Sequence, residues 1–108
     1  MSAITRLALM IAVGGIATGC FRKSYRNAIQ HELAGQLSPA ALSYIAALDK
    51  RPGHAKSRAA LAEIAHDVYK IELSQAEAAR DAEHYDEALR RYKKLQTLID
   101  GFTRYQAL

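Results

Sequence analysis

The sequence predicts an all-α protein, and three observations point to that fold class. From residue 20 onward, 17 of the 42 hydrophobic residues are Ala, a strong helix former, whereas Val, Ile and Thr together number only 8. Apolar residues in this region recur every three or four positions, which is the period of a helix. Residues that break helices stand between segments of helical length, and they are Gly35, Pro39, Pro52, Gly53 and Gly101.

The first two expected helices form a short antiparallel hairpin. One covers residues 24–34 and ends at Gly35, with an inner face made of Tyr25, Ala28, Ile29 and Leu33. The other continues to Lys50, with Ser38 as its N-cap and Pro39 at its first position, where a missing N–H is no loss. Its inner face is expected to contain Ala41, Tyr44, Ala47 and Leu48.

The last two expected helices form a longer hairpin. Residues 55–82 predict an extended third helix, whose inner face consists of Leu61, Ala65, Val68, Ile71, Gln75, Ala79 and Ala82. Residues 85–99 predict a fourth helix, and its apolar side chains at alternating spacings of three and four are Tyr85, Ala88, Tyr92, Leu95, Ile99 and Phe102. Opposite charges four positions apart support this helix on its outer face.

The length and composition exclude several kinds of protein. The chain has 108 residues, 15 Lys and Arg against 11 Asp and Glu, and one Cys. One Cys allows neither an intramolecular disulfide framework nor a four-thiolate zinc site. A chain of this length is one small domain at most, too short for a dinucleotide-binding domain with a separate substrate domain.

The first twenty residues have the order of a secretory signal. Arg6 is followed by an apolar run over residues 7–13, then by small residues up to Gly19, and then by the single cysteine, Cys20. A membrane-spanning helix is the competing interpretation. The uncharged stretch over residues 7–21 is 15 residues long, whereas a span needs about 20 apolar residues.

The four residues Ala17-Thr18-Gly19-Cys20 resemble the lipobox of bacterial lipoproteins, with Ala17 at the position where Leu is commonest. The resemblance implies that residues 1–19 are a signal peptide and that Cys20 carries a covalent lipid, a thioether-linked diacylglyceride with a further acyl chain on its amino group. Phe21 stands where this family places an Asp to retain proteins in the inner membrane, so the outer membrane, facing the periplasm, is expected. The alternative is an ordinary signal peptide that ends beside an incidental cysteine.

Three cations follow the cysteine closely, at Arg22, Lys23 and Arg26. Anionic lipid headgroups attract such clusters. We expect residues 20–23 to be a lipid-anchored linker and residues 24–108 to be the helical domain. The other interpretation of the cations is the solvated start of a helix.

Two segments of the domain can be aligned with each other, residues 35–48 with residues 83–96. Here the chain resembles tetratricopeptide repeats, and it would contain about two of them. The positions that carry the resemblance, which we expect to pack between helices, are Ala40, Tyr44, Ala47, Pro52, Tyr85, Ala88, Tyr92 and Leu95. The two copies are 48 residues apart, against 34 in the family, and the extended third helix holds the excess. A generic bundle of helical hairpins is the alternative.

Catalytic chemistry is not expected. His31-Glu32 begins like a zinc-protease helix, but Gly35 stands where the second histidine belongs, and His66 has no neighbour at ligand spacing. We therefore predict no enzyme activity, no metal and no cofactor other than the lipid on Cys20. A hydrolase that uses His31 and His66 is a third class. Residues 90–94 place Tyr92 between two pairs of cations, as nucleic-acid-binding patches do. A solvated helix face is favoured over nucleic-acid binding.

Together these features predict a lipid-anchored adaptor or scaffold of the bacterial cell envelope. It would bind another envelope protein or a second copy of itself through its repeat-like helical surface, and assist assembly of an outer-membrane complex. Two repeats are fewer than the roughly three needed for independent stability, so residues 102–108 are expected to be exposed and to meet a partner. The alternative is a structural lipoprotein that binds peptidoglycan or spaces the membrane from the wall.

Overall fold

A computed structural model of the chain describes residues 20–108, and every regular element in that part is a helix. The N-terminal helix covers residues 20–33 of the described chain. It is followed by α2 (Leu37–Lys50), α3 (Ala55–Asp81) and α4 (Tyr85–Arg104). The predicted all-α fold class with an extended third helix is confirmed. The predicted signal peptide, residues 1–19, lies outside the described residues.

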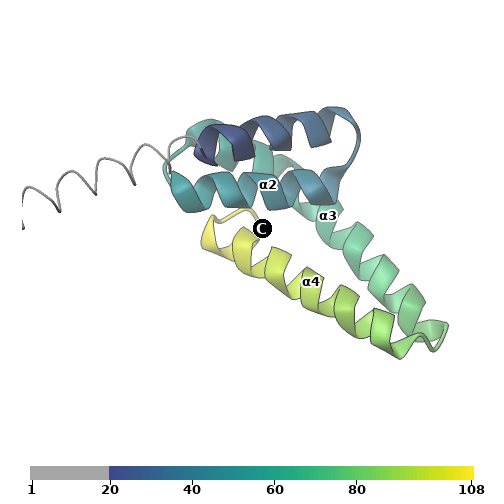
Figure 1. The fold of residues 1–108 in the computed structure, drawn as a ribbon. Helices are drawn as coiled ribbons and strands as arrows, with labels where there is room; N and C mark the ends of the chain where they lie inside the picture. Colours follow the sequence, from purple (N-terminus) through teal and green to yellow (C-terminus); the bar gives the residue numbers. More distant parts are fainter. Residues whose placement is uncertain (1–19) are drawn as a thin grey trace, which may run out of the picture.

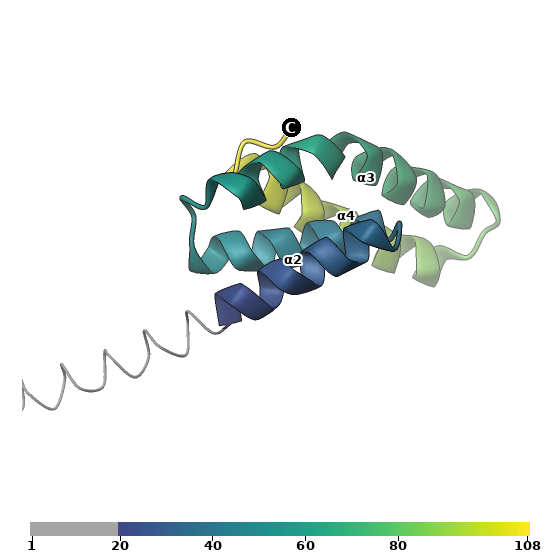
Figure 2. The ribbon, with the colours of Figure 1, turned by 90° about the horizontal axis from the view of Figure 1, so that it is seen from above.

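Each helix packs chiefly on the next one along the chain (Figures 1 and 2). The N-terminal helix lies beside α2, where the rings of Tyr25 and Tyr44 have centroids 6.4 Å apart. The longest helix, α3, has 27 residues and therefore extends for about 40 Å. It contacts α2 with its first half, and α4 runs back along it. The second half of α3 and the start of α4 thus project past the shorter hairpin (Figure 1).

The turn within the shorter hairpin and the turn within the longer hairpin have the same backbone conformation. Gly35 has φ +76°, and the N–H of Gln36 donates to the carbonyl of His31 at 2.8 Å. Glu83 has φ +62°, and the N–H of His84 donates to the carbonyl of Ala79 at 2.9 Å. Both are Schellman turns, which end a helix with one residue in the left-handed region. The same turn ends α4, where Gln106 has φ +55° and the N–H of Ala107 donates to the carbonyl of Phe102 at 2.8 Å, so it is a general helix end of this fold.

The main core lies where the two hairpins meet. Leu48, Leu61, Val68, Leu98 and Phe102 have no exposed surface, and they come from α2, α3 and α4. The core also takes Ala28 from the N-terminal helix and Tyr105 from the residue that follows α4. The expected inner face of α2 is confirmed, because Ala41, Tyr44, Ala47 and Leu48 are all buried.

The expected inner faces of the other helices need correction. Leu33 is 83% exposed, because the N-terminal helix ends there and the chain turns away. Tyr85 is 65% exposed at the first position of α4. In the second half of α3 the expected Ile71 is 41% exposed, whereas Glu72 is buried.

Three expected boundaries also differ from the structure. Residues 20–23 form a helical turn and not a linker, because Phe21 packs into the body and is only 4% exposed. The helix α2 begins at Leu37, and Ser38 lies buried within its first turn without capping it. The helix α4 does not stop at Ile99 but continues through Gly101 to Arg104.

The chain after Phe102 is likewise not the exposed end that we expected. Phe102 is fully buried and Tyr105 is 7% exposed. The Tyr105 hydroxyl donates to the carboxylate of Asp49, which also accepts from Arg104 Nη1 at 2.7 Å. These contacts fasten the end of α4 to the end of α2, so this segment completes the protein's own core.

Candidate partner-binding groove

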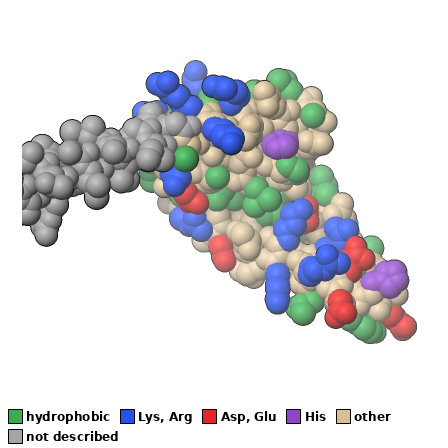
Figure 3. Space-filling view, viewed as in Figure 1, with side chains coloured by type: hydrophobic (Ala, Val, Ile, Leu, Met, Phe, Trp, Pro, Cys, Tyr) green, Lys and Arg blue, Asp and Glu red, His purple; other side chains and the backbone are tan. Residues whose placement is uncertain are grey.

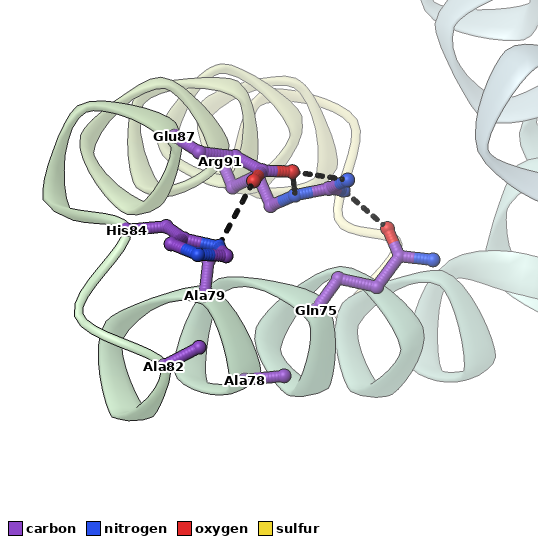
Figure 4. A pocket seen from close by; sticks show the side chains of 7 residues that line it. All are labelled: Gln75, Ala78, Ala79, Ala82, His84, Glu87 and Arg91. Atoms are coloured by element: carbon purple, nitrogen blue, oxygen red, sulfur yellow. Dashed lines mark hydrogen bonds and ion pairs between the residues drawn. The ribbon is translucent and has the colours of Figure 1, made fainter.

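Adjoining hollows follow one side of the longer hairpin, and we call the two larger ones together the α3–α4 groove. The hollow beside the shorter hairpin has a volume of about 340 Å³ and is lined by Gly35, Gln36, Leu37, Ser38, Pro39, Ile71, Glu72, Gln75 and Lys94. The hollow nearer the α3–α4 turn has a volume of about 290 Å³ and is lined by Gln75, Ala78, Ala79, Ala82, His84, Glu87 and Arg91 (Figure 4). Gln75 belongs to both hollows.

The most unusual side chain of the groove is Glu72. It projects from the buried side of α3, and its side chain is 3% exposed. Its Oε1 atom lies 3.3 Å from Lys94 Nζ on α4, and the Lys94 side chain is 43% exposed. Its Oε2 atom is buried and has no hydrogen-bond partner among the described residues.

A buried carboxylate of this kind is costly for the fold. Buried polar atoms are nearly always hydrogen-bonded, and leaving one without a partner costs about 1–3 kcal/mol or more when the group is charged. The single ion pair with the half-exposed Lys94 compensates only one of the two oxygens. Glu72 is therefore a better candidate for a binding role than for a purely stabilising one.

The hollow nearer the turn has a different character, because its polar groups are paired with one another (Figure 4). Arg91 Nη1 donates to Gln75 Oε1 at 2.7 Å, and Arg91 Nε donates to Glu87 Oε1 at 3.1 Å. His84 Nδ1 lies 3.9 Å from Glu87 Oε2. Small alanine side chains from α3 line the rest of this hollow. It adds shape to the groove but no unsatisfied polar group.

The residues of the repeat-like pattern are buried to different degrees. In the first copy Ala40, Tyr44 and Ala47 are buried in α2, whereas Pro52 is exposed. The Tyr44 hydroxyl donates to Glu32 Oε1 at 2.6 Å, and burial together with this carboxylate raises the pKa of Tyr44.

In the second copy Ala88 and Leu95 are buried and Tyr92 is half-buried. Tyr92 accepts a hydrogen bond from Arg80 Nη1 at 3.4 Å. The expectation that Tyr85 packs between helices is wrong, since it lies at the exposed start of α4. The two copies thus share their small and central aromatic positions but not their outer ones.

The predicted lipid site, Cys20, is exposed at the beginning of the described chain. It lies at the opposite end of the body from the α3–α4 turn (Figure 1). The next residue, Phe21, stacks at 6.0 Å on Tyr25 and meets His54 edge-on at 4.8 Å. Cys20 is therefore followed directly by a residue that is packed into the body.

The histidines have local roles. His54 caps α3, where its Nδ1 atom accepts from the N–H of Ser57 at 3.3 Å. His31 pairs with Gln36 across the first turn, and His66 is exposed. Within residues 20–108 no three His, Cys, Asp or Glu side chains are close enough together to hold a metal ion. In the same part of the chain no helix has the length and apolar character of a membrane span.

Sequence reasoning missed Glu72, although the sequence contains a signal for it. The spacing from Val68 to Glu72, Ala76 and Ala79 is helical, so a continuous buried stripe passes through the carboxylate. A second apolar stripe passes through Ile71, and the spacing alone does not decide which of the two stripes is buried.

Comparison of the chain with protein-family models, curated proteins and solved structures gave no match.

Proposed function

We propose that this chain is a lipid-anchored, non-enzymatic adaptor of the bacterial cell envelope that binds another protein in the α3–α4 groove. The observation that carries the proposal is the buried Glu72, whose Oε2 atom has no donor within the described protein. A partner segment that displaces the half-exposed Lys94 side chain would reach the carboxylate and supply that donor, as a backbone N–H or an amine. It would also cover Ile71, an aliphatic side chain of the same hollow that is 41% exposed.

The anchor part of the proposal is supported by the sequence around Cys20. The apolar run, the small residues and the cysteine follow the order of a lipoprotein signal, and Cys20 is exposed and accessible for modification. Two or more acyl chains make a membrane attachment effectively permanent. Phe21, instead of an Asp, supports an outer-membrane location facing the periplasm, where the adaptor would assist assembly of a membrane complex.

Site-specific photo-crosslinking in cells tests the groove. A crosslinking residue at Gln75, inside the groove, should give one discrete protein adduct. The same residue at Lys70, which is exposed on α3 and does not line the groove, should not. The adduct from position 75 should disappear in Glu72→Leu, while Glu72→Leu itself unfolds at no lower urea concentration, because removing a half-paired buried charge is often neutral or stabilising.

Two results would contradict the groove proposal. One is an adduct that persists in Glu72→Leu. The other is recovery of the chain only with peptidoglycan and never with a protein, which would favour the structural lipoprotein instead. If the purified partner binds the wild type and Glu72→Leu equally, the groove is not the binding site even when an adduct forms.

The anchor has its own test. Wild-type protein purified from membranes should have the mass of residues 20–108 plus a diacylglyceride and an acyl chain. The Cys20→Ala variant should lose that added mass and leave the membrane fraction. An unchanged mass and unchanged fractionation in Cys20→Ala would rule out lipidation, and it would leave the groove proposal to be judged separately.

A further inference from the structure

Cationic side chains gather at the end of the body where residue 20 lies (Figure 3). They come from the N-terminal helix, from the end of α2 and from the start of α3. We call this surface the basic pole, and its exposed members are Arg22, Lys23, Arg26, Lys50, Arg51, Lys56 and Arg58. None of the seven forms an ion pair with an acidic side chain within residues 20–108.

Contacts between these segments show that the basic pole is one surface. The Arg51 guanidinium lies 4.7 Å from the centre of the Phe21 ring, which joins the end of α2 to the N-terminal helix. Arg58 Nε donates to the carbonyl of Pro52 at 2.9 Å, which joins α3 to the preceding turn. The field of these cations acts on His54 at the centre of the surface, where burial and then Arg51 and Lys56 lower the pKa of the imidazole.

The turn between α3 and α4 is acidic, although the part of α4 that follows it is basic. Residues 77–87, around the α3–α4 turn, contain five acidic side chains and a single cation, Arg80. Arg80 is itself paired with Asp81 at 3.3 Å. The acidic turn lies at the end of the ribbon opposite residue 20 (Figure 1). It is followed on α4 by the cations Arg90, Arg91, Lys93 and Lys94, so the acidic region is confined to the turn.

The packing of Phe21 bears on the orientation of the body at a membrane. An apolar run leads up to Cys20 in the sequence, and the helix is packed into the body from Phe21 onward. We propose that the basic pole is a docking face for an anionic phospholipid surface, which holds the body on the membrane with the α3–α4 turn directed away from it. This rests on the membrane attachment in the proposed function, through a lipid on Cys20, and not on the groove.

The physical basis is the attraction between clustered cations and anionic headgroups, which is strong near the surface and is screened by salt. Phospholipid is favoured over other polyanions because the proposed lipid attachment, Cys20, lies at the basic pole. The acidic residues of the far turn are repelled by the same surface, so attraction and repulsion favour one orientation.

Lysine footprinting of the full chain tests the proposal. The protein is reconstituted in phosphatidylcholine vesicles with or without phosphatidylglycerol, and acylation of each lysine is followed by mass spectrometry. Lys23, Lys50 and Lys56 should react several-fold more slowly when phosphatidylglycerol is present. Lys70 and Lys93, exposed elsewhere on the body, should react at the same rate in both vesicles and serve as internal controls. Salt near 1 M, where the Debye length is about 3 Å, should remove the protection.

A matched pair of variants separates docking from general charge. Arg51→Gln combined with Arg58→Gln should weaken the protection of Lys23 and Lys50. Arg90→Gln combined with Lys93→Gln removes the same charge from α4 and should leave that protection intact. Equal protection at Lys70, protection that does not depend on phosphatidylglycerol, or equal effects of the two variants would each overturn the proposal, whatever the crosslinking at Gln75 shows.

Discussion

Glu83 occupies a backbone conformation that suits glycine. Its φ of +62° lies in the left-handed region, where a side chain costs about 1 kcal/mol relative to Gly, and the equivalent turn has Gly35 at φ +76°. Glu83→Gly should therefore raise the free energy of unfolding, but by no more than about 1 kcal/mol, because the greater freedom of Gly in the unfolded chain offsets part of the gain. For a domain of this size the melting temperature should rise by a few degrees, which calorimetry measures.

The reciprocal change at Gly35 is the control for that prediction. An added Cβ at Gly35 meets no atom within 4 Å, so Gly35→Glu tests the backbone alone. It should lower the melting temperature by a similar amount. If Glu83→Gly is itself destabilising, then the Glu83 side chain contributes an interaction that outweighs its backbone strain.

His54 makes the stability of the protein depend on pH. Its pKa is lowered in the fold from an ordinary value of 6.5 by burial and by Arg51 and Lys56. The unfolded chain therefore binds the proton more readily than the folded one. The contribution of His54 is complete above pH 6.5 and is lost as the pH falls through the lower, folded-state pKa, because a protonated Nδ1 cannot accept from the Ser57 N–H.

We predict that the urea midpoint of unfolding falls between pH 7.5 and mildly acidic pH, roughly where an imidazole titrates. His54→Asn should flatten this dependence, because Asn is a good N-cap that does not titrate. His66→Asn, at an exposed position of the same helix, should retain the full dependence. Retention of the full dependence in His54→Asn would assign the pH effect to another group.

At the scale of the elements, Gly101 sets how closely α4 approaches α2. A Cβ built at Gly101 would lie 2.9 Å from Ile45 Cγ1 and 3.2 Å from Ile45 Cγ2. Gly101→Ala should therefore destabilise the protein by about 1–3 kcal/mol through overpacking, although Ala is the better helix former. Chemical denaturation of the variant measures the change.

The cause of that loss can be tested with a double-mutant cycle. Ile45→Ala removes Cγ1, Cγ2 and Cδ1, the three atoms that the new Cβ would meet. In the Ile45→Ala background, Gly101→Ala should be stabilising, because only its helix propensity remains. The same loss in both backgrounds would mean that Ile45 does not limit the approach of the helices.

Helical spacing predicted the helices and the inner face of α2, but it could not decide between competing stripes on the other helices. It located α3 to within one residue and identified the inner face of α2, because Gly and Pro mark those ends clearly. It misjudged Gly101 as a helix end, since a glycine required for close packing has no distinctive sequence pattern. The groove could not be predicted, because it depends on the ion pair between Glu72 and Lys94. Only the packing of α4 on α3 brings Lys94 Nζ to within 3.3 Å of Glu72 Oε1.

At the scale of the whole molecule, stability is unevenly distributed along the longer hairpin. The core takes Leu61, Ile64, Ala65 and Val68 from the first half of α3, and Leu98 and Phe102 from the last part of α4. Beyond Glu72 the buried side chains of α3 are only Ala76 and Ala79. Amides in residues 73–92 should therefore exchange with solvent faster than those in residues 58–69 and 96–103, which hydrogen-exchange mass spectrometry measures. Uniform exchange along both helices would contradict this picture.

The order of packing along the chain also has a kinetic consequence. Each helix rests mainly on its successor, and α2 and α4 share only a small contact, so most contacts join residues close in sequence. Chains with such low contact order fold within microseconds to milliseconds. The exceptions join α2 to α4 across more than fifty residues, where Ile45 lies against Gly101 and where Asp49 binds Arg104 and Tyr105. During synthesis from the N-terminus, the two hairpins would therefore form in chain order, and the contacts between α2 and α4 would form last.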